Sequence, residues 1–96
     1  MKKELNMNLN RFKKKIRKEL ATHNKTWKRK NIGRSGDEWT NKKGNRIWID
    51  YTDLAVHAYK KGKIIDYYQY SWNQPYFSNR KAELIVKRAK KYMKKL

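Results

Sequence analysis

The chain has no cysteine, one proline, four glycines and only eight acidic residues among its 96. Without cysteine it forms neither a disulfide framework nor a thiolate metal site, and a reducing cytoplasm is the expected compartment. Long apolar runs are also missing, since the longest aliphatic run is Leu84-Ile85-Val86. We therefore expect no signal peptide and no membrane partner.

Lysine and arginine dominate the composition and give the chain a formal net charge of +19. Residues 1–34 hold 13 basic against 2 acidic residues, residues 77–96 hold 8 against 1, and residues 35–76 hold 6 against 5. Self-repulsion on this scale destabilises a compact state, so the charge indicates a polyanionic partner. Lysine outnumbers arginine 20 to 7, a bias of AT-rich codons that suits a low-GC bacterium or its phages, and hence a bacterial host cell.

Two helices are predicted at the ends of the chain. Leu5, Leu9, Phe12, Ile16 and Leu20 form one apolar stripe after an Asn8 N-cap. A second helix starts at the Ser78 N-cap and runs to the end of the chain. Its apolar face holds Ala82, Ile85, Val86, Ala89, Tyr92, Met93 and Leu96.

Strand patterns fill the middle of the sequence. We predict strands near Glu38-Trp39-Thr40, over 46–51 and over 64–72, the first two joined by a hairpin loop at 41–45. Residues 53–61 fit either a helix or a further strand, with the strand slightly favoured. The expected fold is one α+β domain over 1–96, a small antiparallel sheet of three to four strands flanked by the two helices, in the order α-β-β-(β)-β-α. Residues 1–7 are expected to fray, and 23–37 to form a basic loop.

The basic helix faces and the basic loop are the predicted binding surface. Lysines and arginines spaced three and four apart on a helix can meet successive phosphates of a nucleic-acid backbone. The candidate residues are Lys13, Lys14, Arg17, Lys18, Trp27, Lys28, Arg29, Lys30, Arg34, Arg80, Lys81, Lys87, Arg88, Lys90, Lys91 and Lys94.

Aromatic residues are the second candidate feature. Nine of the thirteen aromatics lie in residues 35–76, and exposed rings there could stack on bases. Alternation makes Tyr68, Tyr70 and Trp72 one set and Tyr67 and Gln69 the other. We take Tyr68, Tyr70 and Trp72 as candidates for base stacking, and whichever set is exposed as the stacking surface.

Catalytic patterns are absent from the sequence. Asp50, Asp53, His57 and Asp66 lie near one another, but without metal-ligand spacing, and are more simply partners for lysine and arginine. No phosphate-binding glycine loop or nucleophile elbow is present. We expect no enzyme, no metal and no cofactor.

The helix start Ser78-Asn79-Arg80-Lys81-Ala82-Glu83 resembles the start of the second helix of double-stranded-RNA-binding domains. It is loosely similar to the helix start of arm-type DNA-binding domains of phage integrases. In the first family this helix start meets phosphates, which implies Arg80 and Lys81 as contacts. The resemblance covers six residues, and we assign the chain to neither family.

The sequence thus supports two hypotheses. The first is a small, non-catalytic protein that binds DNA or RNA through backbone phosphates with low sequence specificity. The alternative is a phage-encoded inhibitor of a host nucleoprotein, such as an anti-CRISPR or other anti-defence protein, docking on guide RNA or on an acidic protein surface.

Overall fold

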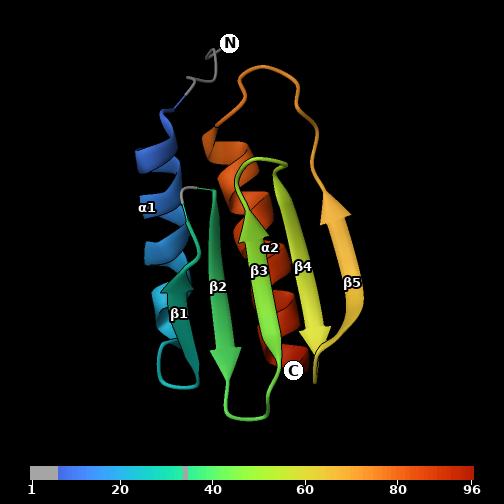
Figure 1. The fold of residues 1–96 in the computed structure, drawn as a ribbon. Helices are drawn as coiled ribbons and strands as arrows, with labels where there is room; N and C mark the ends of the chain where they lie inside the picture. Colours follow the sequence, from blue (N-terminus) through green and yellow to red (C-terminus); the bar gives the residue numbers. More distant parts are fainter. Residues whose placement is uncertain (1–6, 34) are drawn as a thin grey trace.

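The structure is a computed structural model that describes residues 7–33 and 35–96. Its elements follow the order α1 (Leu9–Leu20), the 3-10 turn η1 (Ala21–His23), β1 (Trp27–Asn31), β2 (Gly36–Asn41), β3 (Arg46–Asp50), β4 (Ala55–Lys60), β5 (Lys63–Gln69) and α2 (Asn79–Lys95). The strands form one antiparallel sheet in sequence order, and both helices cover the same face of it (Figure 1). The α+β class is therefore confirmed, with five strands in the described chain in place of three to four.

Both helices begin at the predicted caps. The Asn8 side chain accepts a hydrogen bond from the Arg11 amide at 2.9 Å, and the Ser78 hydroxyl accepts one from the Lys81 amide at 3.1 Å. Each cap satisfies one of the amides that a helix start leaves without a partner. All seven residues predicted for the apolar face at the C-terminal end of the chain are buried.

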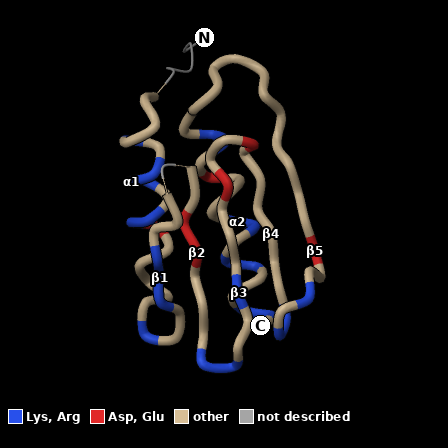
Figure 2. Tube along the Cα trace, in the orientation of Figure 1, with Lys and Arg blue, Asp and Glu red and all other residues tan. Residues whose placement is uncertain are grey.

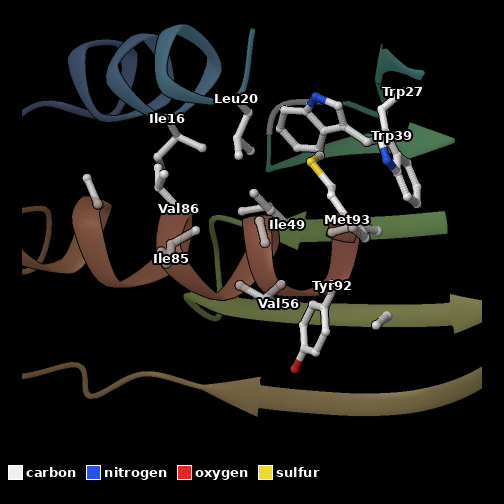
Figure 3. Packing of buried hydrophobic residues seen from close by; sticks show 14 of the residues in the cluster. Ile16, Leu20, Trp27, Trp39, Ile49, Val56, Ile85, Val86, Tyr92 and Met93 are labelled. Carbon is white, nitrogen blue, oxygen red and sulfur yellow. The ribbon is translucent and has the colours of Figure 1, made fainter. Parts of the chain in front are cut away.

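The core lies between the helices and the sheet. Ile47, Ile49 and Tyr51 alternate along the chain and point inward, and none is more than 1% exposed. Figure 3 shows Ile16 of α1 facing Val86 of α2, with Ile49 of β3 and Val56 of β4 lying against α2. Burying a large aliphatic side chain contributes about 1.5–3 kcal/mol, so this contact layer holds the helices on the sheet.

The ambiguous segment is a strand. β4 and β5 form a hairpin whose turn residues Lys61 and Gly62 have φ of 49° and 84°. Positive φ at both central positions is what a tight hairpin turn of this hand requires. The strand prediction for 53–61 is confirmed and the helical alternative is wrong.

Two predictions near the N-terminus need correction. The expected loop over 23–37 contains η1, β1 and the start of β2. β1 was missed because it is an edge strand in which only Trp27, 2% exposed, reaches the core. Residues 1–6 of the expected frayed segment lie outside the described residues, but the Met7 amide donates to the Phe77 carbonyl at 2.7 Å, so Met7 is held in place.

A candidate nucleic-acid interface

Four chain segments bring lysines to one end of the molecule. In a five-stranded meander the β2–β3 and β4–β5 turns lie at the same end, and this end also receives the η1–β1 turn and the last turn of α2 (Figure 1). Figure 2 shows Lys and Arg gathered on these turns. We call this surface the basic end, made by Lys25, Lys28, Lys42, Lys43, Lys60, Lys61, Lys94 and Lys95.

Local geometry fixes the turns that carry these lysines. In the β2–β3 turn the Asn41 side-chain oxygen accepts from the amides of Lys43 at 3.1 Å and Asn45 at 3.0 Å. The Asn45 side-chain oxygen accepts from the Lys61 amide at 3.2 Å, which ties this turn to the β4–β5 turn. The side-chain amides of Asn41 and Asn45 also donate to the carbonyl of Leu96, at 3.3 and 3.2 Å. The basic end is therefore one connected unit.

Three neighbouring hollows mark the surface. The first, about 830 Å³, lies between α1 and β1, and the second, about 530 Å³, lies between the η1–β1 turn, the β2–β3 turn and the end of α2. The third, about 390 Å³, lies between the β2–β3 and β4–β5 turns and the end of α2. Lys28 lines both the first and the second, and Lys43 lines both the second and the third. The hollows therefore form one continuous surface, which we call the basic track.

The electrostatics of the track are of one sign. Among the described residues that line the three hollows there is no Asp or Glu. The basic residues that line it are Lys13, Lys14, Arg17, Lys18, Lys25, Lys28, Arg29, Lys42, Lys43, Lys60, Lys61, Lys94 and Lys95. A concave surface with one sign of charge focuses the field and raises the local concentration of anions. Close to the track, burial and then the charges of Lys90 and Lys94 lower the pKa of His23.

An ion-pair network lies behind the first hollow and holds two of its lining residues, Arg17 and Arg29. Asp37 is fully buried and accepts from Arg17 Nε at 2.7 Å and Nη2 at 2.9 Å, from Arg29 Nη1 at 3.2 Å and from the Tyr51 hydroxyl at 2.7 Å. The hydrogen bond to Asp37 raises the pKa of Arg17, and burial raises that of Tyr51 well above its ordinary value. Arg17 and Arg29 are therefore committed to Asp37, and Lys13 is 9% exposed with its Nζ 5.4 Å from the centre of the Tyr51 ring. The exposed cations of this hollow are Lys14, Lys18, Lys28 and Arg29, of which only Arg29 pairs with Asp37.

The other predicted residues differ in where they lie. Trp27 is 2% exposed and packs in the core beneath the first two hollows, which it also lines, and Arg34 lies outside the described residues. Lys30 lines none of the three hollows, and Lys87, Lys90 and Lys91 stand on α2 beside the track.

Of the remaining three cations, Arg80 lines a separate hollow at the start of α2, and Lys81 and Arg88 hold the structure together. Lys81 Nζ donates to the carbonyls of Asn73 and Tyr76, the second at 3.1 Å. Arg88 Nε donates to the Tyr70 hydroxyl at 3.0 Å, and its guanidinium lies 4.1 Å from the centre of the Tyr68 ring.

The aromatic candidates divide between the two faces of the sheet. Tyr68 and Tyr70 point to the helix side, 4.7 Å apart between ring centres, and Tyr68 is 44% exposed. Trp72 is 56% exposed, and its indole nitrogen donates to the Asp53 carbonyl at 3.2 Å. Tyr67, from the other set, faces the open side of the sheet.

The aromatic rings on the open face of the sheet pack against one another. Trp48 stacks on His57 with ring centres 4.3 Å apart, and Tyr67 meets His57 edge-on at 4.8 Å. A Cβ on Gly36 would lie 2.6 Å from Trp48 Nε1, so the indole lies directly over the β2 backbone. Burial lowers the pKa of His57, which keeps this imidazole neutral at pH 7. Trp48 and His57 therefore offer little free face to a base, whereas Tyr67 stays 46% exposed.

The acidic residues near His57 do not gather. Asp50 accepts from the backbone amides of Thr52 and Asp53, at 2.9 and 3.3 Å, as part of the β3–β4 turn. Asp66 accepts from the Tyr92 hydroxyl of α2 at 2.8 Å, on the helix side of the sheet. In residues 7–33 and 35–96 no group of three or more His, Asp or Glu could hold a metal ion.

Sequence reasoning missed most of the turn lysines. Lys25, Lys42, Lys43, Lys60, Lys61 and Lys95 lie in short turns or at the ends of β4 and α2, and none is among the individual candidate residues named from the sequence. The usable signal was that lysines flank Gly44 and Gly62, the two hairpin glycines.

Comparisons of the chain with protein-family models, curated proteins and solved structures find no match. In the described part of the chain, neither helix is long and apolar enough to cross a membrane. The functional argument therefore rests on the geometry above.

Proposed function

We propose that the protein binds nucleic acid along the basic track, through backbone phosphates and with low sequence specificity. One observation carries the proposal: the three connected hollows are lined by lysines from separate chain segments and by no acidic residue among those described. A lysine ammonium is a point charge that pairs with phosphate in many orientations, whereas base readout uses planar, bidentate groups. The surface suits a backbone rather than a sequence.

The proposal concerns binding and includes no chemical step. No catalytic residue is assigned, since Asp50 serves a turn and Asp66 serves the contact with α2. DNA and RNA carry the same phosphate chemistry, so both are tested.

Salt dependence is the first test. A track that meets roughly six phosphates should give a log–log slope of affinity against salt of about −5 for duplex DNA and about −4 for a single strand. Fluorescence anisotropy with labelled random-sequence oligonucleotides, from low to physiological salt, measures the slope. A slope near zero contradicts the proposal. Absence of binding at low salt also does, and would leave the track to a nucleoprotein or acidic protein partner.

Charge reversal locates the contact. The variant Lys28→Glu/Lys43→Glu changes the two lysines that each line two hollows. It should reduce the magnitude of the log–log slope of affinity against salt by about two. The control Lys30→Glu/Lys63→Glu makes the same change of charge at exposed lysines that line none of the three hollows. Equal losses of affinity in the two variants would show that binding depends on the overall charge and not on the basic track.

A further inference from the structure

A fourth hollow lies on the helix side of β5, away from the basic end. Its volume is about 440 Å³, within the range of small-ligand sites. It is bounded by the end of β5, the uncharged segment 70–78 and the first two turns of α2 (Figure 1). The lining residues that matter here are Tyr68, Tyr70, Pro75, Arg80 and Leu84.

The Tyr68 ring is held in a fixed position at this hollow. The Arg88 guanidinium lies 4.1 Å from the ring centre, and the Tyr70 ring lies 4.7 Å away at 59°. Tyr70 is itself fixed, because its hydroxyl donates to the Leu84 carbonyl at 3.0 Å and accepts from Arg88 at 3.0 Å. Arg88 is outside the lining set while Tyr68, 44% exposed, is part of it. The guanidinium therefore supports the ring from behind.

The floor and the loop side of the hollow are also fixed. Leu84 is 41% exposed and adds an apolar side chain to the lining, next to Tyr70. Lys81 Nζ ties the loop to α2 through the carbonyls of Asn73 and Tyr76. A rigid aromatic and apolar hollow lowers the entropy cost of ordering a ligand.

Cations connect this hollow to the basic track. Arg80 lines the hollow, Lys95 lines the third hollow of the track, and Lys87 and Lys91 are exposed on α2 between them. At 1.5 Å per residue the helix covers about 22 Å from Arg80 to Lys95. No Asp or Glu is among the described residues that line either hollow.

We infer that this hollow takes one unpaired base of a single-stranded nucleic acid, stacked on Tyr68, with the neighbouring phosphates on Arg80 and on the lysines of α2. The inference rests on the proposed function and specifies its substrate as single-stranded. A base inside a duplex is stacked on its neighbours and cannot enter, whereas an unpaired base is free to stack on an aromatic ring.

The test compares Tyr68→Ala with a matched variant. Tyr59→Ala also removes a tyrosine stacked by an arginine, with Arg46 4.2 Å from its ring centre, but on the open face of the sheet. Stacking is worth about 1–3 kcal/mol per base, which is roughly a 5- to 150-fold change in affinity. Tyr68→Ala should therefore weaken binding of single-stranded DNA and RNA at least about fivefold. Duplex binding and the salt slope should stay unchanged, and Tyr59→Ala should bind both forms as the wild type does.

Two further arms make the outcome decisive. Tyr68→Phe keeps the ring and should restore single-strand affinity, and melting temperatures of all three variants report whether the fold is intact. Single strands that carry abasic positions should bind the wild-type protein with an affinity reduced by the same factor. Tyr68→Ala should bind these strands as tightly as it binds intact single strands. If single-strand binding is unchanged in Tyr68→Ala while Lys28→Glu/Lys43→Glu still weakens it, the base site is wrong and the basic track stands. If neither nucleic-acid form binds, both are wrong.

Discussion

Asp37 is the residue that lets a strongly basic surface fold. It is fully buried, and it neutralises Arg17 from α1 and Arg29 from β1 while also accepting from the Tyr51 hydroxyl. The network joins the first helix to the edge of the sheet. Removing one partner of such a network leaves a buried group without compensation, which costs more than the pair contributes.

We expect Asp37→Ala to lower the free energy of unfolding by about 3–5 kcal/mol. Glu38→Gln is the control at the next position, because it removes only the ion pair with Arg46, whose side chain is 41% exposed. A pair of that kind contributes about 0–1 kcal/mol. Urea unfolding of both variants checks the difference. Similar losses would show that the buried network adds nothing particular to stability.

At the residue scale, the sequence predicted contacts between residues close in the chain and missed contacts between residues far apart in the chain. The Asn8 and Ser78 caps were predicted, because a cap depends on residues within one helical turn. Lys13 and Arg17 were predicted as free phosphate contacts, yet Arg17 pairs with Asp37, which lies 20 positions away. The sequence pattern carries no signal for a pairing over that distance.

At the element scale, β5 is the exposed edge of the sheet and needs protection from pairing with other chains. Its seven residues are all exposed, including Ile64, Ile65 and Tyr68. Asp66 accepts from the neighbouring Tyr67 amide at 2.8 Å and from the Tyr92 hydroxyl at 2.8 Å, and the pairing with β4 is irregular at Ala58/Tyr59. An occupied amide and an irregular register both discourage a further strand from adding.

We expect Asp66→Ala to self-associate, because it frees the edge amide and releases β5 from α2. Sedimentation velocity at rising protein concentration measures the effect, with Asp53→Ala as a control for the loss of one exposed negative charge. The hydrogen bond from Tyr92, followed by the one from the Tyr67 amide, lowers the pKa of Asp66. The wild-type contact therefore persists down to about pH 4 and is lost only as the pH falls further. A monomeric Asp66→Ala variant would contradict this role.

The elements themselves were predictable where one face is buried along their length. Both helices and β3 carry a periodic apolar pattern, so their faces could be read from the sequence. β1 reads Trp-Lys-Arg-Lys-Asn with one core residue, because an edge strand has little surface to bury. That missed strand is the main error in the predicted sheet.

At the scale of the whole molecule, the net charge was predictable but its arrangement was not. The sequence suggested basic helix faces at the two chain ends. The meander instead brings the lysines of four separate segments to one end, as Figure 2 shows. Missing β1 hid the η1–β1 turn at that end, whereas the β2–β3 and β4–β5 turns share one end of the meander whether or not β1 precedes them.

The described charges are arranged unevenly along the molecule. The basic end gathers lysines from four segments, whereas Asp50, Asp53 and the uncharged segment 70–78 lie toward the opposite end, together with Arg80 and Lys81 of α2. The field of a polyanion exerts a torque on such a charge distribution and turns the basic end forward before contact. We expect the association rate constant with nucleic acid to fall steeply as salt is added and the dissociation rate constant to change less. Stopped-flow measurements decide this, and an association rate that salt does not alter would rule out oriented approach.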